Sequence, residues 1–75
     1  DQGYADAQYN LGMMYSIGEG VVQNHKEAYF WLLLAAANGL EEAKVERDTI
    51  AQELSKEQQE EVQARATKWF AEHSD

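Results

Sequence analysis

The side chains of this chain that could carry out acid–base or metal chemistry are few and poorly spaced for it. The 75 residues include two His and no Cys. A helical zinc site needs two His at i and i+4 with a carboxylate beside them, whereas His25 and His73 are far apart. His25 and Glu27 are two positions apart and would point to different sides of a helix. No serine lies in a nucleophile-elbow pattern. We therefore expect no catalytic residue, no metal, no cofactor and no enzyme activity.

The pair of glycines at Gly18 and Gly20 is the other pattern that could indicate chemistry, because a Gly-x-Gly loop can bind phosphate. That function requires a preceding strand and a following helix within a βαβ unit. The residues before Gly18 follow a helical period and not a strand period. We interpret the glycines as a connection between two helices.

Composition and charge narrow the classes of partner. Six basic and fourteen acidic residues give a formal net charge of -8. Because binding to a phosphate backbone depends on Lys and Arg, nucleic acid is an unfavourable partner, and a partner with basic residues is favoured. The longest apolar run, residues 28–37, is much shorter than the ~20 residues that span a bilayer, so no membrane insertion is expected. The 44% of hydrophobic residues predicts a folded domain.

The first two helices are predicted from apolar spacing and from the residues at their ends. From Tyr4, one face carries Ala7, Leu11, Met14 and Tyr15, and Gly12 within this helix predicts close approach of a partner helix. Gly18 suits the left-handed position that ends this helix. Asn24, with Glu27 three residues later, predicts the start of a second helix through a capping box. Its residues 28–37 are apolar nearly all round, which predicts burial on more than one side before Gly39 ends it.

Two further helices are predicted after Gly39. Residues 40–54 form an acidic amphipathic pattern, and Ser55 with Gln58 makes a second capping box. Glu61 and Arg65 are spaced as a favourable i, i+4 pair in the fourth helix. The apolar face of that helix consists of Val62, Ala66, Trp69 and Phe70.

A weak internal repeat links the two halves of the chain. Gly3 and Gly39 are 36 positions apart, and so are Ala7 and Ala43, but the second copy has Arg47 where the first has Leu11. Terminal units of repeat arrays are expected to be atypical. We therefore predict a single all-α segment: one full repeat over residues 1–39, the first helix of a degenerate second repeat over 40–54, and a C-terminal capping helix over 55–75.

Several spaced residues resemble a known repeat family. These are Leu11-Gly12-Met13-Met14-Tyr15, Gly18-x-Gly20-Val21, Lys26-x-Ala28, Trp31, Ala35-Ala36 and Gly39-x-x-x-Ala43. Together they are similar to the repeat of the Sel-one-like repeat proteins, which are relatives of the tetratricopeptide repeats. Val22 stands where the family often has Pro, and Asn24 stands where Asp is common. The resemblance implies an α/α solenoid, a right-handed superhelical segment of about four antiparallel helices, that binds a protein or peptide without catalysis.

The resemblance also nominates binding residues. In related tetratricopeptide repeats the first helix of each pair contacts the partner on the concave side, which by position implies Asp6, Tyr9, Met13 and Ser16. Tyr9 and Met13 could instead pack on the third helix. A second hypothesis is structural: because about three repeats are usually needed for stability, the chain would serve as the terminal cap or oligomerisation segment of a longer array. Its apolar repeat edge would then favour self-association.

Overall fold

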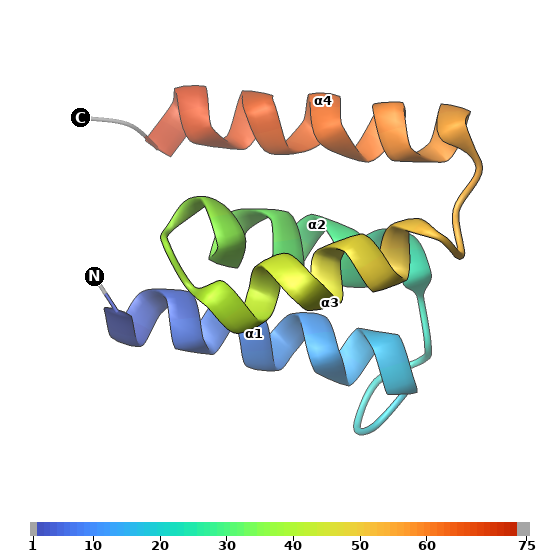
Figure 1. Ribbon diagram of the computed structural model, residues 1–75, viewed down its shortest axis with the longest axis horizontal. Coiled ribbons are helices and arrows are strands. Elements are labelled where there is room, and N and C mark those ends of the chain that lie inside the picture. The colour runs from blue at the N-terminus through green and yellow to red at the C-terminus, as the bar shows by residue number, and fades with distance from the viewer. Residues whose placement is uncertain (1, 74–75) are drawn as a thin grey trace.

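The computed structural model describes residues 2–73, with side chains from Tyr4 to His73, as four helices and no strand. The helices are α1 (Gln2–Ile17), α2 (His25–Ala37), α3 (Glu41–Ala51) and α4 (Lys56–His73). In Figure 1, α1 and α3 run in one direction and α2 and α4 in the other. The predicted all-α class is confirmed. The last two residues of the predicted capping segment, 74 and 75, lie outside the described residues.

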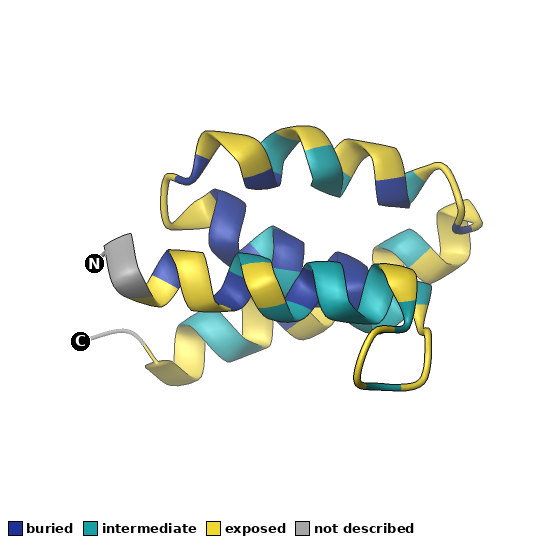
Figure 2. Ribbon diagram, turned by 90° about the horizontal axis from the view of Figure 1, so that it is seen from below, coloured by how far each residue is buried: buried dark blue, intermediate teal, exposed yellow. Residues whose placement is uncertain are grey.

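Helix α2 forms the centre of the fold, because α1, α3 and α4 all pack on it. This arrangement follows from its sequence, which is apolar on every side. Figure 2 shows the buried residues concentrated in this central helix and on the faces turned toward it. The prediction that the second helix lies between neighbours is confirmed. Its buried residues are Ala28, Tyr29, Phe30, Leu32, Leu34, Ala35 and Ala36.

Gly12 lies in a close contact between α1 and α2. A Cβ added there would lie 2.9 Å from Cγ of Leu32 and 3.3 Å from the carbonyl oxygen of Ala28. Leu32 is fully buried, so its side chain has no room to withdraw. The predicted role of Gly12 in close helix packing is confirmed.

The helix C-termini form the predicted glycine caps. Gly18 has a φ of 76° and Gly39 a φ of 95°, the left-handed region that favours glycine. After α2, the amide of Gly39 donates to Ala36 and the amide of Leu40 donates to Ala35, which is the hydrogen-bond pattern of a Schellman motif. Gly20, with a φ of 77°, completes the turn from α1 to α2.

The two predicted capping boxes differ in the structure. At α4 the box is complete: the amide of Gln58 donates to Oγ of Ser55, and the amide of Ser55 donates to Oε1 of Gln58. At α2 only half of it forms. The side chain of Asn24 accepts from the amide of Glu27, but the amide of Asn24 donates to the carbonyl of Tyr15. The carboxylate of Glu27 binds Arg65 instead.

Two predictions about helix faces and limits are wrong. Ala7 was expected on the buried stripe of the first helix, but it is exposed, and the buried positions are Ala5, Gln8 and Gly12. The stripe is displaced because α2 is the only helix that packs extensively on α1. The third helix covers residues 41–51 of the predicted 40–54, since residues 52–54 form the turn into α4.

Candidate protein-binding surface

The four nominated residues lie along one stripe of α1. Asp6, Tyr9, Met13 and Ser16 follow one another at three or four positions, which places them on adjacent turns of the same helix face. Asp6 is exposed, and the other three are half-buried. Tyr9 and Met13 pack part of their surface against the core, and the remainder stays accessible to solvent. The carbonyl of Ser16 accepts a hydrogen bond of 2.9 Å from Nε2 of Gln23.

The direction of this stripe follows from the contact of Tyr4 with α4. The rings of Tyr4 and Trp69 are stacked with centroids 6.3 Å apart, so this flank of α1 is turned toward α4. At 100° per residue, Met13 points about 180° and Tyr9 about 140° away from Tyr4. In Figure 2, α3 lies to one side of α1, whereas α4 lies far behind α1 and is displaced toward the other side. The stripe is therefore on the side of α1 that is occupied by α3.

A buried polar contact that the sequence analysis missed fixes α1 against the end of α2. Gln8 is only 2% exposed, and its Oε1 accepts a hydrogen bond of 2.9 Å from Nδ2 of Asn38. Its Nε2 has no partner among the described residues. Gln8 lies between Ala5 and Gly12 on one helix face. Two small residues at i-3 and i+4 are the signal that this position lies in a close helix contact.

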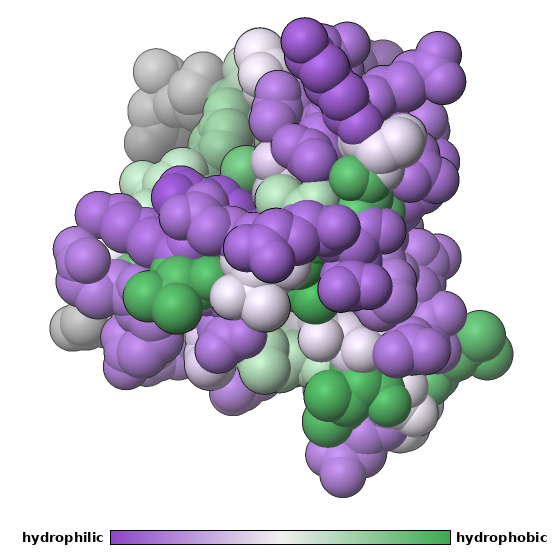
Figure 3. Space-filling view, turned by 45° about the vertical axis from the view of Figure 1, so that its right-hand side comes forward, coloured by the Kyte–Doolittle hydropathy of each residue, from purple (hydrophilic) through white to green (hydrophobic). Residues whose placement is uncertain are grey.

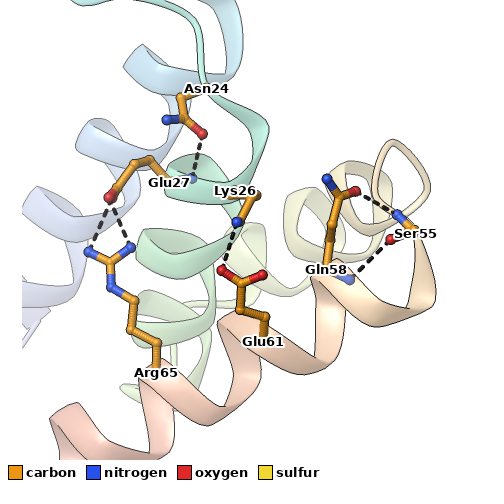
Figure 4. A network of polar contacts seen from close by, with 7 residues as sticks. All are labelled: Asn24, Lys26, Glu27, Ser55, Gln58, Glu61 and Arg65. Atoms are coloured by element: carbon orange, nitrogen blue, oxygen red, sulfur yellow. Dashed lines mark hydrogen bonds and ion pairs between the residues drawn. The ribbon is translucent and has the colours of Figure 1, made fainter.

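Two ion pairs link α2 and α4 (Figure 4). The ammonium of Lys26 lies 2.7 Å from Glu61, and the guanidinium of Arg65 binds Glu27 at 2.9 and 3.4 Å. The guanidinium carbon of Arg65 also lies 3.8 Å from the centre of the Phe30 ring. The predicted i, i+4 pair within α4 is therefore wrong, because Glu61 and Arg65 each reach across to α2. Ion pairs that are partly exposed to solvent, as these are, contribute at most about 1 kcal/mol each to stability.

Besides a groove at the ion pairs of Lys26 and Glu27, two further shallow grooves lie beside α4. One of about 280 Å³ runs over Leu33 and Ala37 toward Arg47 of α3. The other, about 320 Å³, is lined by Trp31 and Trp69 among others. His73 stacks on the Trp69 ring with centroids 4.0 Å apart, and its Nδ1 lies 2.8 Å from the carbonyl oxygen of Trp69. This His is thus held in an aromatic contact at the end of α4.

Across residues 4–73 the structure contains no group of three or more His, Cys, Asp or Glu side chains placed to hold a metal ion. His25, at the start of α2, is half-buried. Within the described range, no helix combines the length and hydropathy needed to cross a membrane. Figure 3 shows a face that is mostly hydrophilic, with separate hydrophobic patches.

Comparison with known protein families assigns the first half of the fold. The model of the Sel1 repeat matches residues 5–40, which include α1, the glycine turn and α2. The chain is a Sel1-like repeat protein. No curated protein and no solved structure matches it. Sel1 repeats form helical solenoids and usually mediate protein–protein interactions, and the proteins that carry them are generally scaffolds without catalytic activity.

Proposed function

We propose that this Sel1-like protein is a non-catalytic scaffold that holds a peptide or partner protein against the concave side of its first helix. The proposed contact residues are Asp6, Tyr9, Met13 and Ser16. The observation that carries the proposal is the position of Tyr9 and Met13: both pack on the core while part of each side chain stays accessible on the α3 side. Partly exposed aromatic and Met side chains held by a rigid helix are frequent anchors in protein interfaces.

Capture experiments with matched variants test this function. The 75-residue chain is immobilised and exposed to a cell extract at about 50 mM and about 500 mM NaCl, where electrostatic attraction is weakly and strongly screened respectively. Proteins retained by the wild type should be lost with the double variant Tyr9→Ser/Met13→Ser and kept with Val22→Ser. Val22 is 87% exposed and lies outside the stripe, so it controls for the general loss of a surface side chain.

The dependence of retention on salt concentration tests the charge of the partner, and the variants test the contact surface. If the partner is basic, retention should fall at the higher salt concentration because screening weakens attraction to a chain of charge -8. Retention that is equal for the wild type and the double variant would refute the proposed surface. Retention that does not change with salt would refute the basic partner and leave the surface in place.

A second candidate function is structural, and one comparison within the chain favours it. Ala7 and Ala43 are equivalent positions of the 36-residue repeat, yet Ala43 is 0% exposed against α2 whereas Ala7 is exposed. The face of α1 with Ala7, Leu11 and Met14 therefore corresponds to the face of α3 that packs on α2. We propose as the alternative that this edge receives another repeat or a second copy of the chain, so that the chain acts as the cap or oligomerisation segment of a longer array.

Sedimentation velocity over a range of protein concentrations tests the structural alternative. If the chain self-associates through this edge, the sedimentation coefficient should rise with concentration for the wild type. It should stay at the monomer value for Leu11→Glu, which places a charge on the edge. A wild-type monomer at every concentration, with a free energy of unfolding above about 5 kcal/mol, would contradict the need for a neighbour.

A further inference from the structure

The groove of about 280 Å³ between α3 and α4 has an apolar floor that the fold covers only in part. Helices α3 and α4 both pack on α2 but only sparsely on each other, so a strip of α2 stays open between them. Leu33 and Phe70 are half-buried in this groove, and Ala37 is exposed. Covering these side chains with a partner would be favourable in proportion to the apolar area removed from water.

Among the described residues, Arg47 provides the only charged side chain in the lining of this groove. Its Nε lies 3.0 Å from Oδ1 of Asp48, whereas its two terminal nitrogens donate no hydrogen bond to any described residue. The side chain is only 31% exposed, so solvent screens its charge incompletely. A guanidinium whose terminal nitrogens are unused can bind a carboxylate through two parallel hydrogen bonds.

The opposite wall of the groove, on α4, offers hydrogen-bond acceptors. Oγ1 of Thr67 donates to the carbonyl of Gln63 at 3.0 Å, and Nε2 of Gln63 donates to the hydroxyl of Tyr29 at 2.9 Å. Because these donors are already engaged, the side-chain oxygens of Thr67 and Gln63 are left to accept. The backbone N–H groups of a bound segment would match this wall, and a carboxylate would match the wall on α3.

The three grooves beside α4 differ in the charges that line them. Glu27 and Glu61 line the groove at the ion pairs, and Glu72 lines the groove with Trp31 and Trp69. No carboxylate lines the groove between α3 and α4. Since the chain has a formal net charge of -8, most of its surface repels an acidic segment. Charge complementarity therefore directs such a segment to this groove.

We propose that the groove between α3 and α4 binds a peptide segment of a partner protein in which a large apolar side chain stands next to an Asp or Glu. The apolar side chain covers Leu33, Ala37 and Phe70, and the carboxylate pairs with the terminal nitrogens of Arg47. The site shares no residue with the stripe on α1 and takes a segment of opposite charge. It is therefore independent of the function proposed above.

Peptide selection on a chain whose α1 stripe is disabled tests this site. A phage-displayed random library is selected on the immobilised Tyr9→Ser/Met13→Ser variant at about 150 mM NaCl, where long-range repulsion is screened but a direct ion pair persists. Enriched sequences should combine Leu, Ile, Phe or Trp with Asp or Glu. The most enriched peptide is synthesised with an amidated C-terminus and a fluorescent label, and fluorescence anisotropy gives its dissociation constant for each variant of the wild-type chain.

The groove variants have matched controls outside the groove. Arg47→Gln should weaken binding about fivefold, which corresponds to the loss of one partly exposed ion pair. Ala37→Glu places a carboxylate at an exposed position of the groove and should weaken binding at least as much. Lys44→Gln removes a cation from the same helix as Arg47, and Ala64→Glu adds a carboxylate at an exposed position of α4. Neither control residue lines the groove, so both should change the dissociation constant less than about twofold.

Three outcomes would overturn the proposal. An enriched peptide that binds the Arg47→Gln and Ala37→Glu variants as tightly as the wild type does not occupy this groove. Enrichment of basic or uncharged peptides contradicts the chemistry of the partner, and a selection that yields no binding peptide contradicts the site itself. None of these results bears on the stripe of α1, because the selection is made without it.

Discussion

Replacing Gly12 by Ala has two opposite effects on the free energy of unfolding. In an exposed helix the change would stabilise the fold by about 1 kcal/mol, because Ala restricts the unfolded backbone more than Gly does. Here the new Cβ would lie 2.9 Å from Cγ and 3.1 Å from Cδ2 of Leu32, and 3.3 Å from the carbonyl oxygen of Ala28. Contacts this short force a displacement of a fully buried side chain or of the helix itself.

The magnitude follows from the difference between these effects. Overpacking a dense core costs about 1–3 kcal/mol, so after the gain in helix propensity we expect Gly12→Ala to destabilise the fold by about 1 kcal/mol. Urea unfolding followed by far-UV circular dichroism measures the change. Asn10→Ala, on the exposed face of the same helix, is the control and should stabilise by about 0.5 kcal/mol. A Gly12→Ala protein that is more stable than the wild type would refute the close contact between α1 and α2.

Three further substitutions test the ends and the attachment of the helices, each by urea unfolding. Ser55→Ala removes the side-chain cap of α4 and should cost about 1 kcal/mol; no loss would mean that the capping box contributes nothing. Gly39→Ala should cost about 1–2 kcal/mol from backbone strain alone, since no atom lies within 4 Å of the added Cβ, and a neutral result would contradict the left-handed conformation. Arg65→Met should cost less than about 1 kcal/mol, because solvent partly screens its pair with Glu27, whose side chains are 49% and 26% exposed, and an equal cost at low and high salt would exclude a contribution from the ion pair.

The features that could be predicted from the sequence are those set by residues close together in the chain. Gly18 and Gly39 end helices because only Gly adopts the left-handed conformation without strain. Ser55 and Gln58 cap α4 through hydrogen bonds that span three positions. The apolar residues of α2 exceed what one helix face can hold, so its central position could also be predicted.

The features that could not be predicted depend on which distant elements meet. Glu27 and Arg65 each had a local role by spacing, as a capping residue and as an i, i+4 partner, but their long side chains find each other across 38 positions. Positions 7 and 43 are both Ala, but Ala43 is buried against α2 whereas no helix covers Ala7. Burial of Gln8 was not predicted because Gln is a polar residue. The small residues around it, Ala5 and Gly12, allow α2 to approach, so Gln8 lies in the contact between α1 and α2.

For the candidate surface, too, some features could be predicted from the sequence and others could not. The stripe of Asp6, Tyr9, Met13 and Ser16 could be nominated from the family resemblance and helix periodicity. Its orientation toward α3 required the stacking of Tyr4 on Trp69, a contact between opposite ends of the chain. The exposure of Val45 likewise required the structure, because the apolar pattern of the third helix alone does not show which residues pack on α2.

Methyl NMR on the two methionines and the valines tests the proposed stripe on α1 most directly. The chain has only two Met, and Met13 lies on the proposed stripe of α1, whereas its neighbour Met14 points about 100° away around the helix and lies near Gly20. On titration with a partner protein retained in the capture experiment, we expect the methyl resonance of Met13 to shift and those of Met14 and Val22 to remain in place. Larger shifts at Met14 than at Met13 would contradict binding at the stripe of α1.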